Sequence, residues 1–365
     1  MSQERAPQAS RAFSRRDVLK GIAVAGAAAT LGSAAGVAGA TARRAPQLAH
    51  PATSLTAMSY QLGWIPNAEF AGTWIALDKG YFAKAGVDVT VIPGGPTTAP
   101  AAIVEAGTAL VTIADPIVTA TAVKQGGQLS IIGAQYQKSP YCLTSLAKNP
   151  IRTPHDMIGR KIGLAASDEP IWHAFLQLNK IAPSQVPTVP IQFDPVVLVE
   201  GECEGIVAFS YEQSSELAQQ GVATSQFLFA DYGFRIMWNT YIVLTSSLQD
   251  SVKRQALTDF LYGEALGWRD QMKNPAEGAA LAVEKYGKSL KLSLPEQTRE
   301  ADGAKALIDT PISRSQGLFV MQPSLISSAL SLLKVLGLSL PRATFDTSLL
   351  AEMHKQHPDV ATLSV

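Results

Sequence analysis

Aromatic and polar side chains follow the ends of predicted strands, the positions at which open α/β sheets bind small ligands. Trp64, Asn67 and Glu69 follow the first such strand, and Asp115 follows the third. A tryptophan offers a flat face on which a planar ring stacks, and an asparagine amide both donates to and accepts from ring nitrogens. These residue types predict a site that binds a small planar molecule.

A second group of candidates lies further along the chain. Ser167 and Glu169 begin a predicted helix, and Tyr211 and Glu212 follow a buried strand. The Glu212 carboxylate could accept the hydrogens of an exocyclic amine, and Trp238 could form the other wall of an aromatic slot. The predicted ligand-binding residues are Trp64, Asn67, Glu69, Asp115, Ser167, Glu169, Tyr211, Glu212 and Trp238.

Most of these candidates also have a purely structural interpretation, which the sequence leaves open. Polar residues at a helix start commonly cap the helix or favour its dipole, and aromatic residues commonly belong to the core. The helix-start alternative applies to Asn67, Glu69, Asp115, Ser167, Glu169 and Glu212. The core alternative applies to Trp64 and Trp238.

The charges near the predicted cleft bear on the charge of the ligand. A free helix N-terminus would bind a sulfonate or nitrate, but Asp168 and Glu169 would repel such an anion there. Lys138 and Arg235 are the basic residues near the predicted cleft. Both would have to point inward to favour an anionic ligand.

The elements that position these residues predict an α/β fold. Residues Gln61–Pro116 read as strand, loop, helix, strand, Gly-Gly loop, helix and strand, a unit that builds a parallel sheet. The Val-rich stretch Asp194–Glu200 favours a strand. Thr240–Thr245 is apolar and β-branched and predicts a strand, and Gln249–Asn274 predicts an amphipathic helix.

The first unit also resembles a known family. Its motifs are Trp64-Ile-Pro-Asn67, Lys79-Gly-Tyr-Phe82 and Gly86-Val-Asp-Val89. They are similar to the opening of periplasmic solute-binding proteins for pyrimidine-precursor, sulfonate, taurine and nitrate importers. The resemblance runs from about Leu55 to about Leu336, and the thiamine-pyrimidine-precursor binders are the most similar branch. In that branch, an aromatic-acidic pair occupies the place of Tyr211 and Glu212.

The resemblance implies a two-lobed type II periplasmic binding fold. Each lobe is expected to be a mainly parallel sheet flanked by helices, with two crossing strands as a hinge. Lobe one is expected at residues 55–145 and 239–365, with C-terminal helices in its second part, and lobe two at residues 146–238.

The function that the resemblance implies is capture of a solute by hinge closure. We expect an extracytoplasmic receptor that delivers a planar nitrogen heterocycle, such as a thiamine pyrimidine precursor, to an ABC permease in the inner membrane. We expect a monomer with no cofactor and no metal site. Sulfonate, taurine, nitrate and larger heteroaromatics such as flavins remain open as ligands.

An enzyme on the same fold is the alternative from another class. The similar yeast-type pyrimidine synthase uses a cysteine-rich run before the return strand, but residues Phe229–Trp238 contain no cysteine. The fold-related desulfinases use a nucleophilic cysteine after the first strand, and Gly63–Phe70 also lacks one. The sequence has no G-x-S-x-G, H-E-x-x-H or P-loop motif either. We therefore expect a protein without catalytic residues.

The N-terminal residues predict export. Arg15 and Arg16 form a twin-arginine motif before the weakly apolar run Gly21–Ala40, which is typical of a Tat signal peptide. We predict a signal over residues 1–42, a spacer over residues 43–54 and a periplasmic protein. The signal contains no cysteine, so no lipid anchor is expected.

Charge and cysteine content limit the other possibilities. Lys+Arg and Asp+Glu balance at 30 each, so no basic field attracts nucleic acid. Cys142 and Cys203 are the only cysteines. The sequence leaves open whether they are buried hydrophobes or form a bridge.

Overall fold

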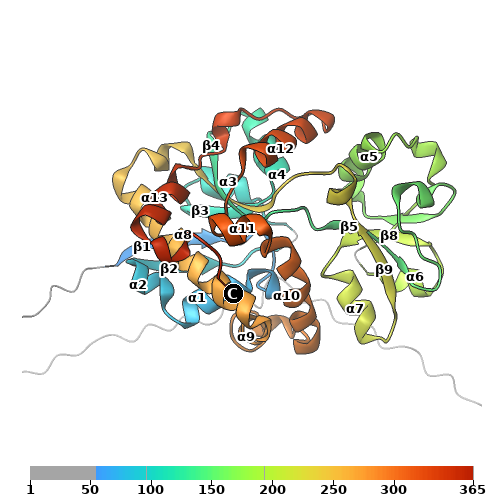
Figure 1. The fold of residues 1–365 in the computed structure, drawn as a ribbon, viewed down its shortest axis with the longest axis horizontal. Helices are drawn as coiled ribbons and strands as arrows, with labels where there is room; N and C mark the ends of the chain where they lie inside the picture. The colour runs from blue at the N-terminus through green and yellow to red at the C-terminus, as the bar shows by residue number, and fades with distance from the viewer. Residues whose placement is uncertain (1–54, 96, 193, 365) are drawn as a thin grey trace, which may run out of the picture. The chain divides into compact units, whose positions relative to one another are not determined.

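Two five-stranded sheets organise the part of the chain that the structure describes (Figure 1). The computed structural model describes residues 55–95, 97–192 and 194–364. The predicted signal peptide and spacer lie outside these residues. All described residues fall in one compact unit. Within them, no helix has the length and the apolar character that crossing a membrane requires.

The first sheet has the strand order β2-β1-β3-β10-β4. β1 pairs in parallel with β2 and β3, whereas β10 pairs antiparallel with β3 and β4. Only β10 therefore runs against the other strands of this sheet. The strands are β1 (Thr56–Gln61), β2 (Val87–Ile92), β3 (Val111–Ala114), β4 (Leu129–Tyr136) and β10 (Trp238–Leu244).

The second sheet repeats this arrangement with the order β7-β6-β8-β5-β9. β6 pairs in parallel with β7 and β8, and β5 pairs antiparallel with β8 and β9. In each sheet, the reversed strand is the one the chain enters after crossing from the other sheet. This topology confirms the predicted pair of mainly parallel sheets. The strands are β5 (Tyr141–Leu146), β6 (Ile162–Leu164), β7 (Thr188–Pro190), β8 (Gly205–Phe209) and β9 (Thr224–Leu228).

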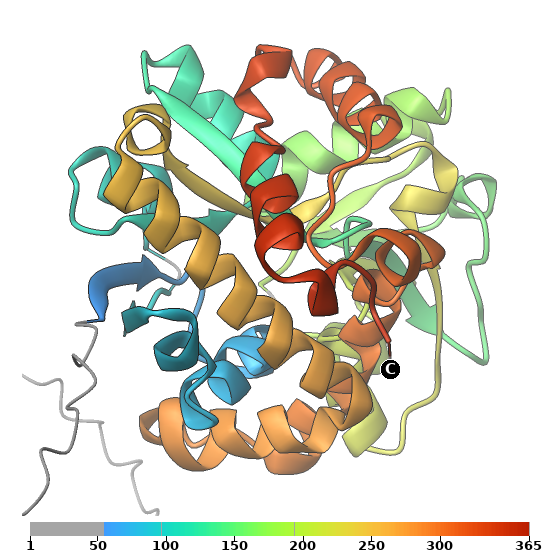
Figure 2. The same cartoon turned by 60° about the vertical axis from the view of Figure 1, so that its left-hand side comes forward.

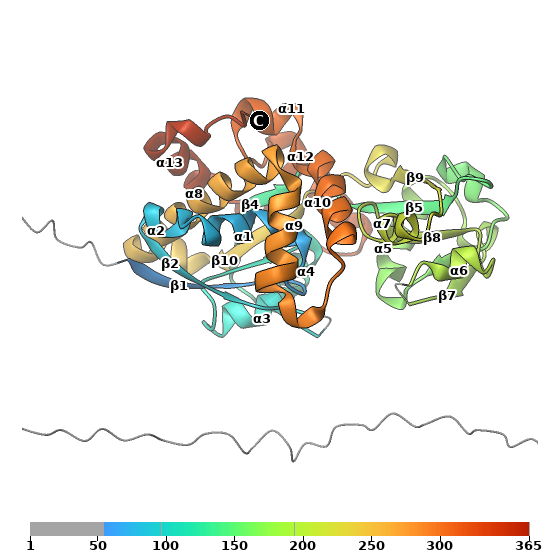
Figure 3. The same cartoon turned by 90° about the horizontal axis from the view of Figure 1, so that it is seen from below.

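Helices flank both sheets, as Figures 2 and 3 show. In Figure 3, α1 and α8 lie on one side of the first sheet and α3 lies on the other. The helices before β10 are α1 (Ala71–Asp78), α2 (Tyr81–Ala85), α3 (Pro100–Glu105), α4 (Pro116–Lys124), α5 (Glu169–Leu178), α6 (Val196–Val199) and α7 (Gln213–Gln219). Those after β10 are α8 (Ser251–Lys273), α9 (Pro275–Leu281), α10 (Leu294–Ile308), α11 (Pro311–Gln316), α12 (Pro323–Val335) and α13 (Ser348–Gln356).

Helix α8 confirms the amphipathic helix predicted over Gln249–Asn274. It begins after Asp250, whose carboxylate accepts from the backbone N–H groups of Val252 (3.0 Å) and Lys253 (3.1 Å). Close packing on α1 depends on small residues, because a Cβ on Gly267 would collide with the carbonyl oxygen of Gly72. The two backbones therefore approach closely beneath the first sheet.

Helix α10 contacts both halves of the fold. Its side chains pack on the turn that precedes α1, and it also packs on α7 beside the second sheet. The Ser293 hydroxyl, at its N-cap, donates to Gln219 Oε1 at the end of α7 (3.2 Å). A Cβ on Gly303 would stand 3.0 Å from the Cβ of Tyr211. α10 therefore ties the first sheet to the second.

The first crossing comes earlier than the sequence analysis places it. Residues 55–145 of the predicted lobe one include most of Tyr141–Leu146, but as β5 this segment pairs with β8 and β9 in the second sheet. The chain therefore leaves the first sheet over Gln137–Pro140 and returns over Gly233–Met237, just before β10. We retain the division into two lobes as a proposal, with its first boundary moved to this earlier segment.

The second sheet has a small core of its own that settles two local questions. The stretch predicted to favour a strand forms helix α6, because Asp194 Oδ1 accepts from the N–H of Val196 (2.9 Å) and Leu198 packs into this core. Cys142 and Cys203 belong to the same core as free, buried thiols. They therefore act as small hydrophobic side chains, the first of the two alternatives.

Candidate functional site

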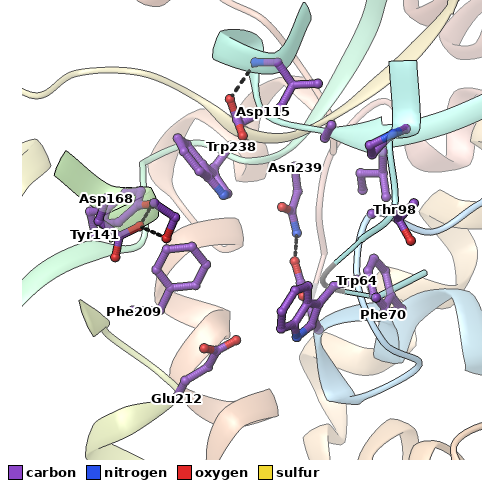
Figure 4. Close-up of a pocket in the computed structure, with 18 of the residues that line it drawn as sticks. Trp64, Phe70, Thr98, Asp115, Tyr141, Asp168, Phe209, Glu212, Trp238 and Asn239 are labelled. Carbon is purple, nitrogen blue, oxygen red and sulfur yellow. Dashed lines mark hydrogen bonds between the residues drawn. The ribbon is translucent and has the colours of Figure 1, made fainter. Parts of the chain in front are cut away.

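A cleft of about 460 Å³ lies between residues of the two sheets, in the usual range for small-molecule sites (Figure 4). Six of the predicted ligand-binding residues line it and three do not. Those that line it are Trp64, Glu69, Asp115, Ser167, Glu212 and Trp238.

The loop after β1 supplies one wall. Trp64 is half-buried and its indole faces the cleft, while Glu69 lies in the 3₁₀ turn Ala68–Phe70. The Asn239 side-chain amide donates to Glu69 Oε1 (2.8 Å), which orients the carboxylate. Gly94 brings the next loop against this one, because any Cβ there would collide with the carbonyl oxygen of Leu62.

Asn67 does not line the cleft. Its Oδ1 accepts from the backbone N–H of Glu69 (3.2 Å), so it caps the 3₁₀ turn. Its Nδ2 donates to Glu300 Oε1 in α10 (2.9 Å). These contacts match the capping alternative, and they leave Asn67 to hold the Trp64 loop against α10.

Asp115 caps a helix and also lines the cleft. Its Oδ1 accepts from the N–H groups of Ile117 (2.7 Å) and Val118 (3.1 Å), so it caps α4. The same residue lines the cleft next to Val118. Burial raises the pKa of the Asp115 carboxyl above its usual value.

The start of α5 contributes Ser167 and Asp168 to the cleft, but not Glu169. The Tyr141 hydroxyl donates to Asp168 Oδ1 (2.9 Å), and the Ser167 hydroxyl donates to the same oxygen (3.3 Å). Glu169 is exposed at the first position of α5. Its position fits the helix-start alternative.

The aromatic-acidic pair after β8 involves a different aromatic residue from the one predicted. Glu212 lines the cleft, whereas Tyr211 is only 1% exposed and packs beneath α10. The aromatic ring that faces the cleft beside Glu212 is that of Phe209. The reason is local geometry: the chain turns after the last residue of β8 and directs the next aromatic inward.

Three aromatic rings form the wall opposite Trp64. The ring centroid of Tyr141 lies 4.9 Å from that of Phe209 and 5.3 Å from that of Trp238, both in edge-to-face contact. Tyr141 and Phe209 are paired across β5 and β8, so their side chains share one face. Sequence reasoning missed both residues, because β8 is apolar throughout and its pattern does not indicate which side chain faces the cleft.

The ionisable side chains of Asp, Glu, Lys, Arg and His type that line this cleft are all acidic. Among the described residues, its lining includes Glu69, Asp115, Asp168 and Glu212 but no lysine, arginine or histidine. Lys138 points elsewhere and stands 3.8 Å from Asp231. Arg235 lines a separate pocket with serines of α12. The condition that would favour an anionic ligand is therefore not met.

Burial changes the protonation of two of these acids. It raises the pKa of Glu69 to about 7, against the stabilising hydrogen bond from Asn239. Burial, reinforced by the negative charge of Glu69, raises the pKa of Glu212 to about 8. Both carboxyls therefore carry protons in the folded protein at a pH where they are ionised in water.

These shifts predict that the ligand-free protein is more stable at pH 6 than at pH 8.5. The folded state holds the protons of Glu69 and Glu212 more tightly than the unfolded chain does, because glutamates in the unfolded chain have a pKa of about 4.3. The free energy of unfolding therefore falls as the pH rises from about 4.3 through the folded pKa values. Thermal midpoints measured from pH 5.5 to 8.5 test this, and a midpoint that rises over this range would contradict it.

The comparisons with known proteins agree with this architecture. A family model described as NMT1/THI5 like matches residues 67–278, more than half of the chain. A twin-arginine translocation pathway signal sequence matches residues 12–32, which confirms the predicted export by the Tat pathway to the periplasm.

Two curated proteins are similar in sequence. The riboflavin-binding protein RibY of Chloroflexus aurantiacus is 24% identical over 246 residues, covering 63% of this chain and 67% of the relative. The formylaminopyrimidine-binding protein of Halalkalibacterium halodurans is 23% identical over 231 residues, covering 61% of this chain and 69% of the relative.

Solved structures show the fold. The aliphatic sulphonate-binding protein SsuA of Escherichia coli superimposes with a TM-score of 0.55 at 13% identity, covering 85% of this chain and 95% of the other. The desulfurization enzyme DSZB superimposes with a TM-score of 0.54 at 13% identity, covering 83% and 99%. The fold is therefore that of the periplasmic binding proteins, and the chain belongs to the NMT1/THI5-like family.

Proposed function

We propose that this protein captures a small planar nitrogen heterocycle, such as a thiamine pyrimidine precursor, and delivers it to an ABC permease. The observation that carries the proposal is the cleft, with aromatic rings on two walls, carboxylates between them and no basic lining residue among those described. A flat ring stacks between the walls, and its amino hydrogens donate to the carboxylates. The similarity to a formylaminopyrimidine-binding protein supports this class of ligand.

The lobes close on the ligand by bending at the two crossing segments. Gln137–Pro140 and Gly233–Met237 join the sheets, and cleft residues Tyr141 and Trp238 directly follow them. A ligand that contacts Trp64 on one side and Phe209 on the other gains both contacts only in the closed form. The permease would recognise that closed form.

A flavin is the second candidate, and one observation favours it. The similar protein RibY is a riboflavin-binding protein, and a flavin also carries a flat ring system with an imide edge. A sulfonate or nitrate is disfavoured because the described lining offers no cationic side chain to bind an anion, and its ionisable side chains are all acids. We propose a binding role and not a catalytic one, and the described lining contains no cysteine, the nucleophile of the fold-related desulfinases.

A thermal-shift screen of the exported protein without residues 1–42 tests the proposal. The panel holds aminopyrimidine precursors, riboflavin, thiamine, taurine, alkanesulfonates and nitrate. A ligand at about a hundred times its dissociation constant stabilises by roughly 2.7 kcal/mol. We expect a raised midpoint with aminopyrimidines. A raised midpoint with riboflavin alone would identify a flavin as the ligand. A raised midpoint with a sulfonate or nitrate would contradict the expectation that a cleft without basic side chains disfavours anions.

A further inference from the structure

Asn239 has an unusual backbone conformation in the wall of the cleft. Its φ is 48°, in the left-handed region that non-glycine residues rarely adopt, although asparagine tolerates it better than most. Three other described non-glycine residues have a positive φ, and none of them lines the cleft: Lys180, Lys291 and Phe319. Asn239 lines the cleft and is only 6% exposed. A strained conformation at a binding cleft points to a function for the residue that adopts it.

The left-handed conformation brings two consecutive side chains to the cleft. Successive residues of a strand normally face opposite sides of the sheet. At the start of β10, however, both Trp238 and Asn239 line the cleft (Figure 4). Trp238 pairs with Tyr136 of β4 and Thr240 pairs with Ala134, whereas Asn239, between them, is paired with no described residue. The interrupted alternation therefore adds an amide to the wall that Trp238 already forms.

The side-chain amide of Asn239 is held in one orientation. Its Nδ2 donates to Glu69 Oε1 at 2.8 Å. If the amide turned over, its oxygen would stand beside the ionised carboxylate, and two acceptors would oppose each other. Glu69 is itself fixed, because Nε2 of the buried Gln135 in β4 donates to its backbone carbonyl oxygen (3.0 Å). Amides from two neighbouring strands therefore position Glu69, and Glu69 orients the amide of Asn239.

Two hydrogen-bonding positions of this amide remain free. Asn239 Oδ1 accepts no hydrogen bond from a described residue, and Nδ2 uses one of its two hydrogens for Glu69. Gln213 is the other amide side chain of the described lining, but its Oε1 already accepts from the N–H of Phe209 (2.9 Å). Asn239 therefore offers a free acceptor and a free donor on one planar group. Asparagine recognises adenine with this pair, by accepting from its amine and donating to a neighbouring ring nitrogen.

We propose that Asn239 is a specificity-determining residue, which contacts the ligand directly and recognises the hydrogen-bonding edge of its ring. The inference rests on the proposed function and deepens it, because this edge belongs to the proposed heterocycle. Oδ1 accepts from the exocyclic amine, and the second N–H of Nδ2 donates to the adjacent ring nitrogen. A carboxylate only accepts and cannot recognise that ring nitrogen. The amine has two hydrogens, so one of them remains for a carboxylate of the cleft.

An amino ligand and its oxo analogue test the inference. In 4-amino-5-hydroxymethyl-2-methylpyrimidine, the amine donates and the adjacent ring nitrogen accepts. In 5-hydroxymethyl-2-methylpyrimidin-4-one, a carbonyl oxygen accepts and the ring N–H donates at the same two positions. Calorimetric titration of the exported protein at pH 8.5 should show roughly ten- to hundredfold tighter binding of the amino compound. Equal affinity for the two compounds, or tighter binding of the oxo compound, would overturn the inference.

Two variants separate the amide from the backbone conformation. Asn239→Gly removes the amide, and glycine adopts the left-handed conformation without strain. This variant should bind the amino compound about tenfold or more weakly and should lose most of the preference over the oxo compound. Asn239→Ala should lose affinity to the same extent, and its thermal midpoint should be lower than that of Asn239→Gly, because alanine is strained there. Normal affinity and preference in Asn239→Gly would show that the amide does not contact the ligand.

Lys291→Gly is the matched control. Lys291 also has a left-handed backbone conformation, with a φ of 55°, but it is exposed and does not line the cleft. The variant introduces the same backbone freedom away from the ligand, so it should keep the affinity and the preference of the unaltered protein. A loss equal to that in Asn239→Gly would mean that backbone freedom causes the effect, and would overturn the inference.

The outcomes distinguish this inference from the proposed function. Equal binding of the amino and oxo compounds overturns the role of Asn239 and leaves a planar nitrogen heterocycle as the ligand. Binding of riboflavin but of no aminopyrimidine, lost in both Asn239→Gly and Asn239→Ala and kept in Lys291→Gly, supports the contact with Asn239 and overturns the aminopyrimidine as the ligand.

Discussion

Glu212→Gln is expected to weaken the binding of an aminopyrimidine roughly tenfold to a hundredfold at pH 8.5. The change keeps the size of the side chain but removes the charge that strengthens a hydrogen bond from an amine, an effect of about 1.5–3 kcal/mol. The ligand-free protein should be at least as stable as before, because burial and the charge of Glu69 disfavour ionised Glu212. Calorimetric titration and thermal midpoints measure the two effects separately.

Glu169→Gln is the matched control for this experiment. Glu169 also lies at the start of a helix of the second sheet, but it is exposed and does not line the cleft. Its variant should bind the aminopyrimidine as the unaltered protein does. If both variants bind with unchanged affinity, Glu212 has no part in recognition. If both variants bind the aminopyrimidine equally weakly, the loss of affinity comes from the change in long-range charge and not from a lost contact with Glu212.

Trp64→Ala is expected to reduce the affinity by a similar factor, through a different interaction. Stacking of a nucleobase-like ring on an aromatic side chain contributes about 1–3 kcal/mol, and Trp64 is one of the rings that the first lobe presents to the cleft. The indole is half-buried, so its removal should cost less stability than removal of a core tryptophan. The loss should be independent of pH, in contrast to that of Glu212→Gln.

Trp64→Phe provides the control, because it keeps an aromatic face of smaller area. We expect its affinity to lie between those of the unaltered protein and Trp64→Ala. An alanine variant that binds normally would show that the ring does not stack on Trp64. An alanine variant with a strongly lowered thermal midpoint would instead favour the core alternative for this residue.

The sequence could predict which loops meet at the cleft, because the carboxyl ends of parallel strands lie at one edge of a sheet. This rule placed Trp64, Asp115 and Glu212 after their strands, and all three line the cleft. It does not tell which residue within a loop faces inward. Asn67 caps a turn and Tyr211 packs beneath α10, since one residue more or less changes the direction of a side chain.

Contacts between distant segments could not be predicted in this way. Glu300 meets Asn67 across 233 positions of sequence, and neither residue type nor spacing indicates this pairing. The same limit explains the first crossing. Tyr141–Leu146 reads as an apolar strand that suits either lobe, and only its pairing with β8 and β9 assigns it to the second sheet.

The β-strand propensity of the Val-rich stretch Asp194–Glu200 also gave a wrong prediction, because local hydrogen bonding and tertiary packing favour a helix there. Val196–Val199 forms a helical turn despite its β-branched residues, because the Asp194 carboxylate accepts from the N–H of Val196 and Leu198 packs into the core of the second sheet. The N-terminal signal was predictable by contrast, since a twin-arginine motif is a local pattern that needs no tertiary contact.

The most direct test of the account is a calorimetric titration of the exported protein with 4-amino-5-hydroxymethyl-2-methylpyrimidine at pH 8. The ligand has a flat ring and an exocyclic amine but no anionic group, as the aromatic and acidic lining requires. We expect saturable binding of one molecule per chain with a dissociation constant on the order of 1 μM or lower, about −8.2 kcal/mol. No binding of this ligand, together with saturable binding of an alkanesulfonate, would contradict the central claim that this cleft recognises a nitrogen heterocycle through its acidic and aromatic side chains.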